Sequence, residues 1–326
     1  MDSSTAAPKA RFIDLEPSEE SFLEAVVAGL RSDPKRLPAK FFYDEEGSKL
    51  FEKICQLQEY YPTRTEIGLL KEIAPQLRAT LPEGTQLVEF GSGSNDKVRI
   101  LLEGVGRFDS YVPIDISREY LRAQANELAA DFPEISVTAI CADYTMDLHL
   151  PRHASNLPEA RLGFFPGSTI GNMKRHEAIT FLSRAAEILG AGAGFLIGAD
   201  LKKDPAMLNA AYNDADGVTA AFNLNLLKRI NRELGADFDL AAFQHDAFYD
   251  EAEGRIEMHL LSLADQSVSI DGQSFGIAKG ECIHTEDSHK FTLDEFSAIG
   301  QAAGLTPEEA WSDDSDLFSV HLFRIR

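Results

Sequence analysis

An apolar strand that runs into a glycine turn and then into a helix constrains the fold of this chain most strongly. The strand contains Leu87-Val-Glu-Phe90, and the turn after it contains Gly91 and Gly93. A second strand, Tyr111-Val-Pro-Ile-Asp115, ends in a carboxylate that follows Gly93 by 22 residues. Open α/β sheets form nucleotide pockets from such turns and place the acidic residue on the ribose diol. An ordinary tight turn would explain the glycines, but not the spacing of Asp115.

The residue at position 96 narrows the choice of nucleotide. A dinucleotide-binding turn would have its third glycine where this chain has Asp96, and a carboxylate would repel a pyrophosphate. A cationic nucleoside without phosphate fits the turn better than NAD does. S-adenosylmethionine (SAM), which carries a sulfonium, an amino-acid end and an adenosine, is therefore the expected cofactor.

Alternating strands and helices predict a parallel sheet. Five strands are expected at residues 86–90, 110–116, 136–141, 161–165 and 194–199. Helices are expected over 17–30, 66–81 and 291–304, and a closing strand over 317–325. This order indicates βαβ units and an α/β fold with a Rossmann-like, doubly wound SAM methyltransferase domain.

Residues 205–248 interrupt this rhythm. They are predicted to be mostly helical, and strands return over 255–263 and 267–270. We therefore expect an inserted α+β substrate-binding domain that faces the strand ends. The expected division assigns 61–200 and 287–326 to the SAM-binding methyltransferase domain, and 11–60 and 201–286 to the substrate-binding domain.

Charge and cysteine usage limit the partners and the compartment. The formal net charge is −22 at pH 7, so a nucleic-acid backbone or an anionic membrane would be repelled. Cys55, Cys141 and Cys282 show no C-x-x-C spacing, no signal peptide is recognisable, and no apolar run is long enough to span a membrane. These features predict a cytoplasmic protein with a small-molecule substrate, which we expect to be a monomer.

Polar residues follow two of the expected strands. Asp143 and Tyr144 could bond an adenine edge and cover its face, although a helix-capping Asp beside a core Tyr is the alternative. Residues 166–172 (PGSTIGN) end in Asn172, whose amide donor and acceptor suit a zwitterionic amino acid. A plain turn would explain the glycines of this stretch, but not its hydroxyls and amide.

The inserted domain supplies two further tracts. In a strand, Glu257 and His259 would share one face and Met258 the other, where it could also be a core residue. Glu286 and Ser288 would project together if extended and could pair with an imidazole or ammonium; a solvated loop is the alternative. The histidines show neither zincin nor Cys/His quartet spacing, so no metal site is expected.

The chain resembles the SAM-dependent histidine Nα-methyltransferases of ergothioneine biosynthesis from about residue 38 to its C-terminus. Four strings carry the resemblance: 42–51 (FYDEEGSKLF), 59–66 (EYYPTRTE), 167–172 (GSTIGN) and 217–225 (GVTAAFNLN). The resemblance implies an enzyme that methylates the α-amino group of L-histidine three times, giving the trimethyl betaine hercynine.

The resemblance also implies the residues of the site. Contacts to SAM are expected from Tyr60, Gly91, Lys97, Asp115, Asp143 and Tyr144. Contacts to the amino-acid substrate are expected from Tyr43, Asn172, Tyr212, Met258, Glu286 and Ser288. Within this set, Asn172 and Tyr212 would bond the carboxylate and amino end, and Glu286 and Ser288 the imidazole. Tyr43 would be the catalytic residue that orients the amine.

Two departures from the family pattern concern the SAM site. Tyr144 stands where the family often has phenylalanine, which keeps an aromatic face. The loop 93–97 and Pro166 also differ slightly. Other functions stay open: related domains act in ovothiol synthesis or methylate indole amino acids, an NAD-type oxidoreductase would share the fold class, and a non-catalytic SAM or amino-acid sensor would share the pocket.

Overall fold

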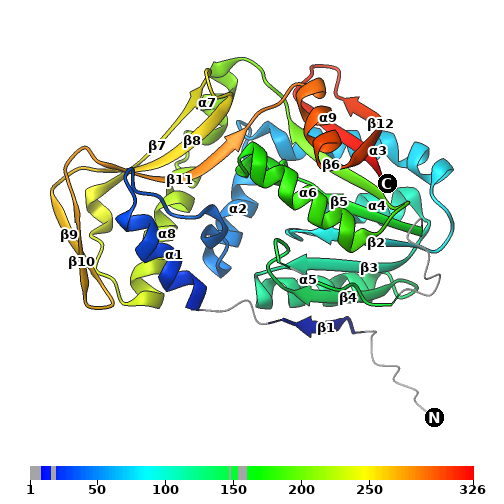
Figure 1. Ribbon diagram of the computed structural model, residues 1–326, viewed down its shortest axis with the longest axis horizontal. Coiled ribbons are helices and arrows are strands. Elements are labelled where there is room, and N and C mark those ends of the chain that lie inside the picture. Colours follow the sequence, from blue (N-terminus) through cyan, green and yellow to red (C-terminus); the bar gives the residue numbers. More distant parts are fainter. Residues whose placement is uncertain (1–8, 16–19, 147, 153–159) are drawn as a thin grey trace, which may run out of the picture.

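The computed structural model describes residues 9–15, 20–146, 148–152 and 160–326, which form two packed units (Figure 1). The larger unit has an eight-stranded sheet in the order β1-β4-β3-β2-β5-β6-β13-β12. Its strands are β1 (Arg11–Asp14), β2 (Thr85–Phe90), β3 (Phe108–Asp115), β4 (Ser136–Cys141), β5 (Arg161–Phe165), β6 (Gly194–Asp200), β12 (Leu305–Ser312) and β13 (Phe318–Ile325). Neighbours from β1 to β6 are parallel, and β13 and β12 are antiparallel. The expected doubly wound α/β sheet is confirmed.

Helices cover both faces of this sheet. One face packs against α3 (Tyr61–Thr80), α4 (Asp96–Val105) and α5 (Arg118–Asp131), and the other against α6 (Arg175–Leu189) and α9 (Leu293–Ala302). Every residue of β2 is buried, as expected of a central parallel strand with helices on both sides. Leu87 and Val88 accordingly belong to two different apolar cores.

The second unit combines helices with small antiparallel sheets. Its sheets are a three-stranded one in the order β11-β8-β7 and the hairpin β9–β10. Its elements are α1 (Glu20–Arg31), η1 (Ala39–Phe42), α2 (Glu45–Gln56), α7 (Pro205–Tyr212), α8 (Val218–Leu234), η4 (Leu240–Ala242), β7 (Phe243–Asp250), β8 (Arg255–Ser262), β9 (Gln266–Ile270), β10 (Gln273–Ile277) and β11 (Cys282–His289). One apolar core contains residues of the N-terminal helices and of the segment 205–286, so parts of the chain that are distant in sequence lie side by side (Figure 1).

The sequence located the five central strands, and the structure differs in other places. The end of the segment expected to be mostly helical is β7. By contrast, the tract around Glu286 is a strand, the extended form in which Glu286 and Ser288 were expected to project together. Helix α3 begins at Tyr61, not 66, because Pro62 in its first turn needs no N–H partner. Residues 17–19 of the first expected helix lie outside the described residues.

Strand β1 bears on the expected division of the chain. Residues 11–14 were assigned to the substrate-binding domain, but β1 pairs in parallel with β4 at the edge of the large sheet. Ladder hydrogen bonds to an otherwise open edge explain this placement, and a four-residue strand gives little periodic signal. The remaining boundaries stay a proposal.

The N-terminal part of the second unit contacts the strand ends of the large sheet. Lys40 pairs with Asp143 at 3.3 Å, and the Ser117 hydroxyl donates to the backbone carbonyl of Tyr43 at 3.1 Å. The Tyr120 hydroxyl donates to Glu52 at 2.7 Å. Residues 40–52 therefore cover the carboxyl ends of β3 and β4.

Two further findings concern the cysteines and the helices. Cys55, Cys141 and Cys282 are free thiols. None of the described helices combines the length and the apolar character needed to cross a membrane.

Candidate active site

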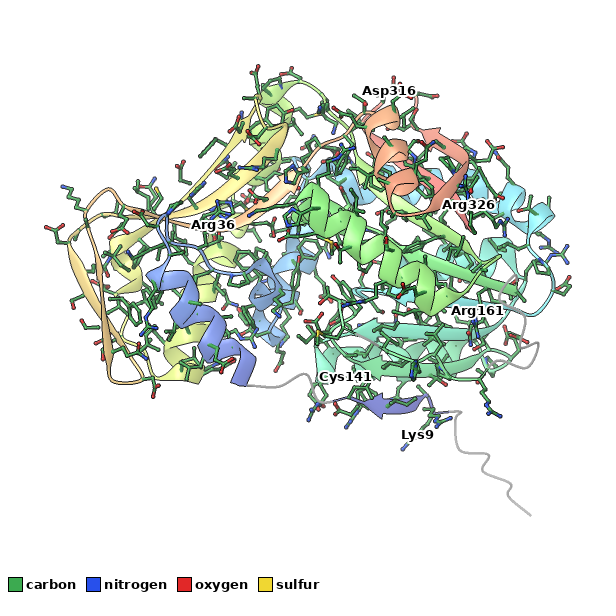
Figure 2. All side chains as sticks on the ribbon, in the orientation of Figure 1. Lys9, Arg36, Cys141, Arg161, Asp316 and Arg326 are labelled. Atoms are coloured by element: carbon green, nitrogen blue, oxygen red, sulfur yellow. The ribbon has the colours of Figure 1, made fainter. Side chains whose placement is uncertain are left out.

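The carboxyl ends of the parallel strands face the second unit. Cys141, the last residue of β4, lies beside that unit, whereas Arg161, the first of β5, lies on the far side (Figure 2). Strand β2 lies between β3 and β5, so the winding reverses at β2 and leaves a crevice outside its carboxyl end. Gly91 follows β2 and Gly167 follows β5, on the two sides of this crevice.

Gly91 brings the backbone close to an aromatic ring. Its φ of 72° lies in the region that favours glycine. A Cβ atom at this position would lie 3.5 Å from Tyr144 and 3.7 Å from Phe165. Tyr144 packs edge-on against Phe165 and Phe181, which fixes its ring. The turn and this ring therefore form a wall suited to a flat base.

Two carboxylates stand after β3 and β4. Asp115 accepts the backbone N–H of Ser117 at 2.7 Å, and burial raises its pKa to about 6. Burial also acts on Asp143, but its bonds from Thr145 and Lys40 hold its pKa below the ordinary value. Both lie at the carboxyl ends of their strands, where the ribose and adenine of SAM are expected to bind.

Lys97 connects the two sides of the crevice. Its ammonium pairs with Glu66 at 2.6 Å, and both oxygens of Glu66 accept the N–H of Gly167 at 3.0 Å. Burial opposes the charge of Lys97, yet Glu66 raises its pKa. Gly198 leaves room for this carboxylate, since a Cβ there would lie 2.2 Å from Glu66 Oε1. The sequence analysis assigned no role to Glu66, because a glutamate in an amphipathic helix usually faces solvent.

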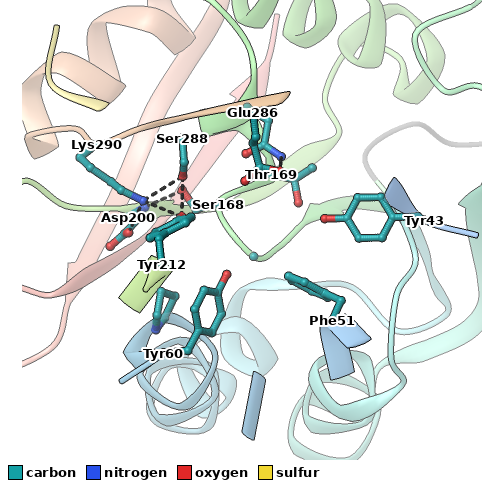
Figure 3. Close-up of a pocket in the computed structure, with 13 residues that line it drawn as sticks. Tyr43, Phe51, Tyr60, Ser168, Thr169, Asp200, Tyr212, Glu286, Ser288 and Lys290 are labelled. Atoms are coloured by element: carbon teal, nitrogen blue, oxygen red, sulfur yellow. Dashed lines mark hydrogen bonds and ion pairs between the residues drawn. The ribbon is translucent and has the colours of Figure 1, made fainter. Parts of the chain in front are cut away.

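A pocket lies where the two units meet (Figure 3). Its walls contain Tyr43, Phe51, Tyr60, Pro62, Gly167, Ser168, Thr169, Asn172, Asp200, Tyr212, Glu286, Ser288 and Lys290. Met258 lines an adjoining space that shares Tyr43, Tyr212 and Glu286 with this pocket. The structure thus brings together all six residues expected to contact the substrate. Tyr60, expected to contact SAM, lies among them.

Strand β11 places Glu286 and Ser288 in the pocket wall. A bulge between His284 and Glu286 shifts the register with β8. Burial raises the pKa of Glu286 to about 7, against the lowering effect of Lys290. The Asn172 amide donates to Glu286 at 3.4 Å. A carboxyl that titrates near neutrality inside a pocket is well suited to accept an N–H from a polar ring.

Aromatic rings close the other side of the pocket. Tyr43 packs edge-on against Phe51 and Phe222, and Tyr60 against Tyr212. Burial and the nearby Glu286 raise the pKa of Tyr43 well above its ordinary value. Tyr43 therefore remains a neutral phenol, which can orient an amine but cannot act as a phenolate base near neutral pH.

Two charged residues of the pocket were missed by the sequence analysis. Lys290 pairs with Asp200 at 2.7 Å, and Asp200 also pairs with Lys203 at 2.6 Å. Burial opposes the charge of Asp200, but the two lysines hold its pKa below the ordinary value. Lys290 stands two residues after Ser288, so the period of a strand could have indicated that they share a face.

The outer face of β8 and β11 carries a polar network. Glu257, His259 and His284 each offer one atom that could bind a metal ion, and these atoms lie within 4.8 Å of one another. Glu257 already accepts from His259 at 2.9 Å and from Arg255 at 2.6 Å, and Arg255 also contacts Asp287 at 3.1 Å. The guanidinium thus supplies the cation that these carboxylates need, and we assign the group to a hydrogen-bonded network.

Comparison with known proteins adds a family context to this geometry. A family model described as histidine-specific, SAM-dependent methyltransferase matches residues 22–325. The chain is 39% identical to a histidine N-alpha-methyltransferase of Mycolicibacterium smegmatis, over 96% of this chain and 98% of that protein. It is 39% identical to the Mycobacterium tuberculosis protein of that name, over 91% and 92%. Ergothioneine biosynthesis protein 1 of Neurospora crassa is 31% identical over 90% of this chain and 33% of its own length.

Proposed function

Because this chain belongs to the family of histidine-specific, SAM-dependent methyltransferases, we propose that it methylates the α-amino group of L-histidine. Three successive transfers would give hercynine for ergothioneine biosynthesis. The observation that carries the choice of substrate is the pair Glu286 and Ser288 in the pocket wall. A carboxyl and a hydroxyl two residues apart match the two nitrogens of an imidazole.

The transfer itself is an in-line displacement at the sulfonium carbon. The lone pair of the amine forms the new N–C bond, the S–C bond breaks, and its electrons return to sulfur. Starting from the ammonium form of histidine, three transfers release three protons and leave one positive charge on the trimethylated nitrogen. The main contribution of the protein is therefore to hold the two reactants in line.

Different pocket residues would bind different parts of the substrate. The Asn172 amide would donate to the α-carboxylate, as expected for a zwitterionic ligand. Tyr212 donates its hydroxyl proton to Ser288, so it would accept an N–H of the amino end. Tyr43 would accept another N–H, so that the lone pair of the amine points at the methyl group. The proton of the amine then leaves to water, since the raised pKa of Tyr43 excludes it as a base. Met258 would pack on the side of the ring.

The crevice residues provide a matching cradle for SAM. Asp115 would bind the ribose diol, Asp143 the adenine edge, and Tyr144 with Gly91 the adenine face. The ion pair with Glu66 takes one of the three N–H groups of Lys97, so the ammonium can also bind the SAM carboxylate. Tyr60 lies in the pocket wall and would contact both ligands where they meet.

We further propose that the enzyme acts as a monomer in the cytoplasm. Its net charge of −22 opposes nucleic acids and anionic membranes as partners. Size-exclusion chromatography with light scattering would test the oligomeric state.

Mass spectrometry tests the function directly. The purified protein is incubated with SAM and an equimolar mixture of the twenty amino acids. Addition of three methyl groups to histidine alone is the expected result. Methylation of another amino acid would overturn the assigned specificity, and ligand binding without any methylated product would favour a sensor.

A further inference from the structure

Lys290 holds three oxygen atoms inside the pocket (Figure 3). Its ammonium lies 2.7 Å from Asp200 Oδ2, 2.9 Å from Ser288 Oγ and 3.1 Å from the Tyr212 hydroxyl. An ammonium has three N–H groups, so these three acceptors use all of them. The Lys290 side chain is 1% exposed, so little water reaches this arrangement.

These bonds dictate where the hydroxyl protons point. Tyr212 accepts from Lys290 and donates its own proton to Ser288 Oγ at 2.8 Å. Ser288 Oγ therefore accepts two bonds, from Lys290 and from Tyr212, and has no lone pair left for a third. Its remaining hydrogen-bonding capacity is the O–H, and Ser288 lines the pocket. Towards a ligand, Ser288 can act only as a donor.

We propose that Lys290 is a positioning residue that makes Ser288 an obligatory donor, so that the site accepts the imidazole only in its neutral form and in one tautomer. This inference rests on the proposed function. The ring nitrogen facing Ser288 carries no proton, and the nitrogen facing Glu286 carries one. An imidazolium would direct an N–H against the hydroxyl proton of Ser288, and such a donor–donor contact is repulsive.

Hydrogen-bond geometry, not charge, selects the neutral ring, because an ionised Glu286 by itself would favour the imidazolium. The charged and titratable groups of the pocket wall are Glu286 on β11, Lys290 directly after β11, Asp200 on β6, Tyr212 on α7, and Tyr43 and Tyr60 near the N-terminal helices. Asp200 neutralises Lys290, which leaves Glu286 as the acceptor for the single ring N–H. Because Glu286 must be ionised to accept fully, histidine binding near neutral pH releases a proton.

Nuclear magnetic resonance of the wild-type protein tests the inference. Histidine labelled with ¹⁵N in the ring is bound together with S-adenosylhomocysteine, which prevents turnover. We expect one protonated and one unprotonated nitrogen down to pH 5.5, below the free-ring pKa of about 6.5. Two protonated nitrogens in the bound ring would overturn the inference and leave the proposed function intact. Absence of binding would overturn the proposed function and the inference with it.

Two lysine variants separate positioning from a structural role. Lys290→Met and Lys203→Met each remove one cation from Asp200, but only Lys290 contacts Ser288. The scarcity of the neutral ring alone should raise the wild-type Kd for histidine about fivefold from pH 6.5 to 5.5, because the neutral fraction falls from about one half to about one eleventh. The rise should be about fivefold smaller in Lys290→Met, which no longer requires the neutral ring, and unchanged in Lys203→Met. Equal rises in all three proteins would contradict the inference; if Lys290→Met does not fold, the resonance experiment decides.

Discussion

Met258 and Glu286 lie directly opposite each other on the antiparallel strands β8 and β11. Side chains in such a cross-strand pair have Cβ atoms about 4.5–5.5 Å apart, so the thioether and the carboxyl can reach the same ligand. Both residues line the same pocket space. Under the proposed function, the choice of amino-acid substrate would thus depend on one apolar and one polar group placed by the register of two strands.

Replacing Glu286 should therefore weaken the selectivity for histidine. In Glu286→Ala the ring N–H loses its acceptor, and kcat/KM for histidine should fall roughly 100-fold, since an unpaired buried polar group costs about 1–3 kcal/mol. The ratio of rates on histidine and tryptophan is measured with SAM in excess. Glu281→Ala, which removes a glutamate paired with Lys35 near the surface, is the control. An unchanged ratio in Glu286→Ala would disprove the role of this carboxyl.

Asp115 should act on SAM and not on histidine. Asp115→Asn keeps the shape of the side chain but weakens its bonds to a ribose diol, so the Kd for SAM should rise roughly tenfold, as for the loss of one charged hydrogen bond. Calorimetry measures the Kd, and Asp131→Asn on α5 serves as the control. A larger effect on the histidine KM than on the Kd for SAM would show that Asp115 belongs to the histidine site and not to the SAM site.

The absence of a side chain at Gly198 should be needed for SAM binding, because it leaves room for the Glu66 carboxylate that pairs with Lys97. In Gly198→Ala the new Cβ would lie 2.2 Å from Glu66 Oε1 and push this carboxylate away from Lys97. We expect lower thermal stability and weaker SAM binding. Gly68→Ala, at a helical position with nothing within 4 Å, should stabilise the protein by roughly 0.5–1 kcal/mol. A Kd for SAM equal to that of the wild type in Gly198→Ala would show that the position of Glu66 does not affect SAM binding.

The parts of the fold with a strong local pattern could be predicted from the sequence. Strands β2 to β6 were located because buried parallel strands are continuous apolar runs. Strand β7 was missed because its buried and exposed positions alternate within a polar sequence that follows two helices. Which strand β1 pairs with depends on contacts over more than 100 residues, and no local pattern records such a contact.

The candidate site divides in the same way. Gly91 and Asp115 follow apolar strands at a readable spacing, whereas the partners of Glu66 lie in α4 and after β5. Lys290 is buried only because Asp200, from another strand, neutralises it. A buried charge requires such a partner, and the pairing forms only in the folded chain.

Tyr43 should affect the rate more than substrate binding. Tyr43→Phe removes the oxygen that would orient the amine, so kcat should fall roughly tenfold while the histidine KM changes little. The shape of the pH profile should stay the same, because the raised pKa keeps this phenol protonated throughout. Steady-state kinetics from pH 6 to 9 measure both, and Tyr249→Phe, on β7, is the control. An unaltered rate would remove Tyr43 from the mechanism.

Glu286 should lower the stability of the ligand-free protein at alkaline pH. Its pKa rises from 4.5 in the unfolded chain to about 7 in the fold, so between these values the native state binds more protons. Stability therefore falls as pH rises through this window, by on the order of 3 kcal/mol when complete. Glu286→Gln cannot ionise and should be the more stable protein at pH 8, with no advantage at pH 4.5. Urea unfolding at both pH values measures the free energy of unfolding of each protein. The buried Glu89 also has a raised pKa, but it is present in both proteins and its contribution cancels in their difference. A difference independent of pH would mean that the charge of Glu286 is not what destabilises the fold.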